Sequence, residues 1–214
     1  MLERMRIHYL LLITILCGLS FATRSFAEGI SRKPADVDAL LARLEAQVPN
    51  EPAGTSPELN ALIDEVGATK RLDAAVLLIR ALSVSFSPVG ESEHRSPFGL
   101  MPAAEALQRN FGSSVLPLLM FSGLTTDKAW LQTRIALAMR GIGSEAEIQS
   151  VRQAFSVDEQ SNPMAQKFDA RLAEPKLRLA DDPVLSLAEQ IERMIEDVLE
   201  KQRQVEKEPK PPSL

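Results

Sequence analysis

The residues whose types could do chemistry gather in one short segment, Glu91-Ser92-Glu93-His94. Two carboxylates and an imidazole could ligate a metal ion, and the His94 imidazole could act as a general base. Ligands that are adjacent in sequence on a loop rarely converge on one ion unaided, and alternating charge is typical of a solvated loop. We therefore expect no metal site and no catalytic site in this segment.

The remaining sequence carries no recognisable catalytic signature. It has no His-Glu-x-x-His pair, no glycine-rich phosphate loop and no Gly-x-Ser-x-Gly nucleophile motif. Its one cysteine, Cys17, lies in the leader described below, so disulfides and cysteine-based chemistry are excluded from the mature chain. We expect neither an enzyme nor a cofactor, and the alternative is an envelope-localised hydrolase whose carboxylates meet only in the folded chain.

The N-terminus has the three parts of a secretory signal peptide. Arg4 and Arg6 precede 14 mostly apolar residues, 9–22, and Ser25-Phe26-Ala27 places small residues at the positions that signal peptidase reads. The apolar stretch is shorter than the roughly 20 residues of a membrane-spanning helix, so we expect cleavage after Ala27 and no stable span afterwards. An uncleaved anchor is the alternative. The predicted location is the periplasm or the cell exterior.

Composition fits a globular chain that binds something other than nucleic acid. The 214 residues are 45% hydrophobic and 25% charged, which is ordinary for a folded domain. The net charge is −5, and loss of residues 1–27 leaves 21 basic and 28 acidic residues, a net charge of −7. This acidic balance argues against a polyanionic partner.

Helical periodicity runs through most of the mature chain. Ser56, Ser144 and Asn162 are predicted N-caps, Asp127 is predicted to cap the helix after it, and Gly67 is predicted to end a helix. Between the predicted helices, the segment 83–99 holds two prolines and two glycines and is predicted to be a long loop. The predicted helices cover 34–48, 57–66, 70–82, 102–111, 128–142, 145–155, 163–172 and 183–204, with a short apolar segment at 114–122.

The middle of the chain contains a repeat. Ala104 aligns with Ala136, Leu107 with Met139, Leu116 with Ile148, and Leu119 with Val151, each pair 32 residues apart, and a weaker copy lies upstream. Two helices and a glycine turn with a period in the thirties indicate an α-solenoid, in which stacked helix pairs share one core.

These repeats resemble the HEAT family. The segment 114–119 is similar to the family's first helix with its proline, Pro117, and Asp127 and Arg134 match its turn aspartate and second-helix arginine. The resemblance covers roughly residues 57–155. It implies a curved all-α scaffold that binds other macromolecules, usually proteins, and it implies no shared catalytic residue.

The predicted fold is therefore all-α: a HEAT-like α-solenoid of stacked helix pairs with an extra N-terminal helix and a C-terminal capping helix. The final helix spaces Leu187, Ile191, Met194, Val198 and Val205 like a coiled-coil seam, and Ile195 and Leu199 widen the stripe. The wider stripe favours docking on the solenoid end, with self-association or a partner helix as the alternative. The predicted segments are a signal peptide (1–27), an N-terminal helix and linker (28–56), repeats (57–156), C-terminal helices (157–205) and a disordered tail (206–214).

The function that these features favour is an exported, non-catalytic protein-binding or scaffold module, and an accessory subunit of an envelope complex is a further alternative. Loops inserted in solenoids often collect on the binding face. For Trp130, packing is favoured over a role as binding anchor, and Phe98 could equally tuck under its own loop. The candidate partner contacts are Phe86, Glu91, Glu93, His94, Phe98 and Trp130.

Overall fold

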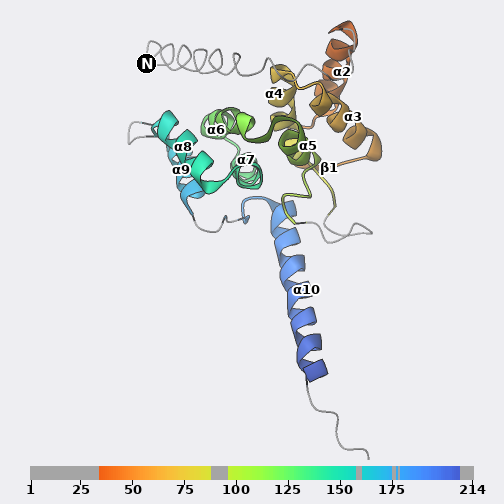
Figure 1. The fold of residues 1–214 in the computed structure, drawn as a ribbon, viewed down its shortest axis with the longest axis vertical. Coiled ribbons are helices and arrows are strands. Elements are labelled where there is room, and N and C mark those ends of the chain that lie inside the picture. Colours follow the sequence, from red (N-terminus) through yellow and green to blue (C-terminus); the bar gives the residue numbers. More distant parts are fainter. Residues whose placement is uncertain (1–33, 88–95, 158–160, 175–176, 178, 208–214) are drawn as a thin grey trace, which may run out of the picture. The chain divides into compact units, whose positions relative to one another are not determined.

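The computed structural model describes residues 34–87, 96–157, 161–174, 177 and 179–207. The chain divides into two units, Met1–Asp36 and Val37–Leu214, and all packing described below lies within the second. The described residues are mostly helical, as predicted for an all-α protein (Figure 1). The helices are α2 (Pro34–Gln47), α3 (Pro57–Ala68), α4 (Leu72–Arg80), α5 (Pro102–Phe111), α6 (Leu116–Thr125), α7 (Ala129–Ile142), α8 (Glu145–Phe155), α9 (Pro163–Ala173) and α10 (Pro183–Lys207), with 3₁₀ turns at Ala81–Ser83 and Gly112–Val115.

The three predicted N-caps are present at their helices. Ser56 Oγ accepts a hydrogen bond from the Leu59 amide at the start of α3, and Asn162 Oδ1 accepts one from the Ala165 amide at the start of α9. Ser144 forms the predicted capping box with its partner three residues later. These caps satisfy amide groups that the first turn of a helix leaves without a partner, which fixes where each helix begins.

Two predicted helix boundaries are wrong. Gly67 does not end α3, which continues to Ala68. Its lack of a side chain lets α5 pack closely, since a Cβ there would press on the side chain of Asn110. Asp127 does not cap α7, whose N-cap is Lys128. The Lys128 amide donates a hydrogen bond to the Thr126 hydroxyl. Asp127 itself is exposed.

The predicted helix 70–82 is divided in the structure. It consists of α4, which ends at Arg80, and a 3₁₀ turn over Ala81–Ser83. The next two residues form β2 (Val84–Ser85), which pairs in parallel with β1 (Ala53–Gly54). The predicted loop 83–99 thus begins with a short strand, and its residues 88–95 lie outside the described part of the chain.

The helices contact one another in a regular order. α5 packs against α3 and α7, while α6 packs against α4 and α8, so from α3 to α8 each helix touches the second helix along the chain. Among helices that succeed one another, α6 and α7 make the most extensive contact, and α3 with α4, α4 with α5 and α7 with α8 also touch. Of the eight residues aligned in the repeat, seven are buried and Val151 is half-buried. The aligned positions therefore share a common role in the core.

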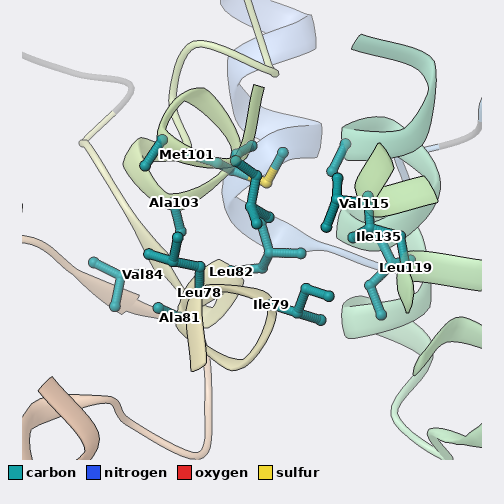
Figure 2. Packing of buried hydrophobic residues seen from close by; sticks show 14 of the residues in the cluster. Leu78, Ile79, Ala81, Leu82, Val84, Met101, Ala103, Val115, Leu119 and Ile135 are labelled. Carbon is teal, nitrogen blue, oxygen red and sulfur yellow. The ribbon is translucent and has the colours of Figure 1, made fainter. Parts of the chain in front are cut away.

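The central core is formed by side chains from α4, the 3₁₀ turn after it, α6 and α7. Figure 2 shows Leu78, Ile79 and Leu82 from α4 and its 3₁₀ turn gathered with Leu119 of α6 and Ile135 of α7. All five are buried, and Leu119 is completely inaccessible. Burial of such side chains is the main favourable contribution to folding in a chain without disulfides.

The C-terminal helices close on this core. α9 packs on α6 and α7, where Gly123 leaves room for the ring of Phe168. At the start of α10, Leu185 and Ala188 are buried in the same cluster. Among the residues that the structure describes, none of the helices combines the length and the hydropathy needed to cross a membrane.

Candidate functional site

Three consecutive polar residues of α7, Gln132, Thr133 and Arg134, are buried, and each reaches a different part of the chain. The Gln132 amide nitrogen donates to the carbonyls of Gly123 and Met164. The Thr133 hydroxyl donates to the Ala129 carbonyl within α7 and accepts from a guanidinium nitrogen of α9. Buried polar groups need such partners, since an unmatched one costs about 1–3 kcal/mol. This stretch of α7 therefore serves as an internal polar link.

The link continues to α10 through a buried ion pair. Arg134 and Asp182 have no exposed side-chain surface, and Arg134 Nε donates to Asp182 Oδ2 at 2.5 Å. Arg134 Nη1 also donates to the Leu82 carbonyl at 2.7 Å, on the turn that follows α4. One guanidinium thus joins three segments that are far apart in the sequence.

Asp182 uses its second oxygen to start α10. Its Oδ1 accepts hydrogen bonds from the amides of Val184 and Leu185, at 3.0 and 3.1 Å. This is N-cap geometry, in which a side chain matches the free amides of the first helical turn. The carboxylate that neutralises Arg134 therefore also fixes where α10 begins.

Trp130 lies over this link. Its ring centroid is 5.6 Å from the guanidinium carbon of Arg134 and 5.5 Å from Lys128 Nζ, so two cations approach one half-buried ring. Cations at this distance are attracted to the face of the ring. The position supports the packing role expected for Trp130, and its role as a partner contact stays a prediction.

Beyond its anchored start, α10 carries apolar side chains on its surface. Leu187, Met194 and Leu199 are 42%, 67% and 46% exposed, whereas Leu185 and Ala188 are buried. Ile191 lies between the first two and is half-buried. We call Leu187, Ile191 and Met194 the α10 seam, because their spacing of four and three places them in one line along the helix. The docking predicted for this helix is found at its start, and the seam is left accessible.

Acidic side chains accompany the seam. Glu196, Asp197 and Glu200 are exposed on the middle of α10. Two arginines on the helix are paired: Arg193 with Glu189 at 2.5 Å and Arg203 with Glu200 at 3.9 Å. The surface of α10 is therefore apolar along one line and predominantly anionic beside it.

The other predicted contact residues are not gathered at one place. Glu91, Glu93 and His94 lie outside the described residues. Phe86 and Phe98 are half-buried against the core, and the ring of Phe98 lies on Gly141 near the end of α7. Trp130 lies eleven residues earlier on α7, about 16 Å along the helix axis, so Phe98 and Trp130 do not form one cluster.

Sequence reasoning missed the Arg134–Asp182 pair. It matched Arg134 to the arginine of a repeat and Asp127 to its turn aspartate, but the partner of Arg134 is 48 residues further on. The available signal was the Asp182-Pro183 dipeptide, which is typical of a helix start. That signal indicates a cap and carries no information about which distant cation the carboxylate meets.

Two further observations complete the site. Within the described ranges, no group of three or more histidine, cysteine, aspartate and glutamate side chains is placed to hold a metal ion. The other large apolar side chains that are exposed in these ranges are Leu72 and Val76, on one face of α4.

No protein-family model, no curated protein and no solved structure matches this chain.

Proposed function

We propose that this chain is an exported, non-catalytic helical-repeat protein that binds another protein through the α10 seam. The observation that carries the proposal is the exposure of Leu187 and Met194 on a helix whose start is fixed by a buried ion pair. Contiguous apolar side chains exposed on a protein surface often mark a site of interaction with another protein. Anchors at i, i+4 and i+7 are also the pattern by which one helix docks into a groove or onto a second helix.

The buried link supports a binding role because it holds the helix that carries the seam. Asp182 ties the start of α10 to Arg134 of α7, which also bonds to the turn after α4, and Leu185 and Ala188 of α10 are buried in the core. A surface that is held in its binding geometry before a partner arrives loses less entropy on association. The seam is therefore a better candidate than an isolated apolar side chain.

The contact order of the helices supports a HEAT-like scaffold. We propose that α4 with α5 and α6 with α7 are stacked helix pairs, because the two helices of each pair touch, α4 touches α6 and α5 touches α7. In this proposal α9 and the start of α10 cover the end of the stack, as terminal repeats require. Arg134 then differs from the family's pattern by pairing with the capping segment instead of the turn aspartate.

Export is the second part of the proposal, and it rests on the leader-like residues 1–27. Material recovered from the periplasm or the medium should begin at Glu28 when its N-terminus is sequenced, because Ala27 completes the small-x-small site. Full-length protein retained in the membrane would contradict cleavage and favour an anchored protein.

Binding is tested by capture from an envelope extract. The chain, expressed with its own leader and tagged after Leu214, is compared with a Leu187→Ser/Met194→Ser variant and with a matched Leu72→Ser/Val76→Ser control. The control removes exposed apolar side chains of similar size from α4. We expect the seam variant to lose the captured protein and the control to retain it, with the circular dichroism of all three unchanged.

A further variant tests the competing surface. Shortening residues 87–96 to a glycine-serine turn removes the loop that sequence reasoning favoured, and the small entropy of loop closure leaves the fold intact. Loss of capture in this variant alone would refute the seam and assign binding to the loop. Capture that survives both changes would refute the two surfaces together.

A further inference from the structure

We infer that the partner of the α10 seam is a basic amphipathic helix, one whose apolar stripe is bordered by lysine or arginine. The inference rests on the proposed function, because it specifies the chemistry of the protein that the seam binds. It is carried by the arrangement of charge around the exposed apolar residues of α10.

The apolar arc of α10 has an acidic residue on each side. Asp197 follows Met194 by three residues, and Glu196 precedes Leu199 by three residues. Three residues turn an α-helix by about 300°, which is about 60° short of a full circle. Counted forward from Met194 and backward from Leu199, this places each carboxylate about 60° outside one edge of the apolar arc. All four side chains are exposed. Within residues 187–200, the apolar arc thus has an exposed carboxylate on each side.

The charge of the whole segment has the same sign. Residues 187–200 hold five acidic residues and one arginine, a net charge of −4. That arginine, Arg193, is already paired with Glu189. Glu200 pairs with Arg203, which lies just beyond this segment. A partner that covers the arc therefore meets the negative charge of Glu196 and Asp197 at its edges, where cations would gain charge-assisted hydrogen bonds.

The length of the surface specifies the size of the partner element. From Leu187 to Leu199 the exposed apolar residues extend over twelve residues, or about 18 Å along the axis. A helix of about three to four turns covers this length with anchors at i, i+3, i+4 and i+7. A basic amphipathic helix of that length supplies both the apolar stripe and the bordering cations.

A second copy of this chain does not fit as well. Two α10 helices would bring the same acidic borders together, with −4 facing −4 across the seam. Like charges at an interface disfavour association and are a common device for rejecting a wrong partner. An anionic membrane surface would be repelled for the same reason.

The test uses three peptides and the full chain. The first is an 18-residue Leu/Lys peptide with a helical apolar stripe, the second replaces every lysine by glutamate, and the third is residues 183–207 of this chain. Each is labelled and titrated with the protein by fluorescence anisotropy. We expect the Leu/Lys peptide to bind at least about tenfold more tightly than either of the others, and its affinity to fall when salt is raised.

Matched charge variants separate a specific border from general attraction. Glu196→Lys/Asp197→Lys reverses the border, while Asp64→Lys/Asp127→Lys makes the same change in net charge at exposed positions away from α10. We expect the border variant to bind the Leu/Lys peptide at least about tenfold more weakly than the unchanged protein does, and the control variant to bind it less than about threefold more weakly. Circular dichroism checks that the variants remain helical.

Several outcomes would overturn the inference. Equal binding of the Leu/Lys and Leu/Glu peptides, equal loss in the border and control variants, or tightest binding by the 183–207 peptide would each do so, and the last would assign the seam to a second copy. If the peptides show no charge preference while envelope capture still requires Leu187 and Met194, the inference fails and the proposed function stands. If the Leu187→Ser/Met194→Ser variant captures the same protein as the unchanged chain, the proposed function fails as well.

Discussion

Replacing Asp182 by alanine should destabilise the whole protein, although this residue lies at the start of the last helix. The change leaves Arg134 charged, inaccessible to water and without its carboxylate. It also removes the oxygen that accepts hydrogen bonds from the amides of Val184 and Leu185. The Leu82 carbonyl alone remains to receive the guanidinium, and it cannot neutralise a charge.

The expected cost combines two contributions. Removing one member of a buried ion pair costs about 3–5 kcal/mol, and losing a side-chain N-cap costs about 1 kcal/mol. The free energy of unfolding should thus fall by about 4–6 kcal/mol. Asp182→Asn should cost less than Asp182→Ala, because its amide oxygen can still accept the two amides of α10.

A double-mutant cycle isolates the pair. Arg134→Met alone leaves the Asp182 carboxylate with two amide donors and leaves the Leu82 carbonyl without its charged donor. The double variant Arg134→Met/Asp182→Ala should therefore cost less than the sum of the single changes, by at least about 1 kcal/mol. The coupling energy measures what the two charged groups contribute together.

Urea unfolding followed by two signals gives the measurement. Far-ultraviolet circular dichroism reports on all helices, and the fluorescence of Trp130 reports on the Arg134 link because the chain has one tryptophan. With a urea slope of about 2 kcal/mol per molar, the midpoint of Asp182→Ala should fall by about 2–3 M. A cost below about 1 kcal/mol, or single changes that add within about 0.5 kcal/mol, would refute the proposed coupling.

Three other changes test the core, a close approach and a cap. Leu119→Ala should cost about 2–5 kcal/mol in a urea melt, because it opens a cavity in the centre, whereas Leu72→Ala, at a half-exposed position, should cost less than about 1 kcal/mol. Gly123→Ala should cost about 1–3 kcal/mol, since its Cβ would overlap an aromatic ring of α9, while Gly54→Ala meets no neighbour and should not produce this loss. The pKa of Glu147 is lowered by hydrogen bonds from the backbone and side chain of the N-cap serine and from the Ser113 side chain. Its stabilising effect is therefore present above the unfolded pKa and lost as pH falls through the folded one, so Glu147→Gln should flatten the acid limb of the stability curve. An unchanged acid limb in that variant would contradict the capping role.

Features set by neighbours in sequence were predicted well. Ser56, Ser144 and Asn162 cap helices because each needs only an amide three residues away. The 32-residue alignment likewise found positions that are buried together, since apolar spacing is a local property of a helix. The predictions for Gly67 and Asp127 failed because α3 continues to Ala68 beside the closely packed α5, and because α7 begins one residue later than predicted, with Lys128 as its N-cap.

The candidate site was only partly accessible to sequence reasoning. The apolar stripe of α10 was visible in its spacing, but spacing could not tell which side docks on the core and which side meets water. In the structure, Leu185 and Ala188 are buried against the core, whereas Leu187 and Met194 are exposed to water. The pairing of Arg134 with Asp182 was not predictable, because a single charge pattern offers many partners and only the fold brings these two together.

The Arg134–Asp182 pair also has a consequence for the order in which the chain is made. Arg134 is synthesised 48 residues before its carboxylate, an interval of about 2–10 s at ordinary rates of translation. During that interval the helices α4 to α7 cannot bury the guanidinium without leaving its charge uncompensated. The core therefore reaches its final packing only after Asp182 has been added. A chain cut off before this residue would have an arginine at its centre without the carboxylate that neutralises it.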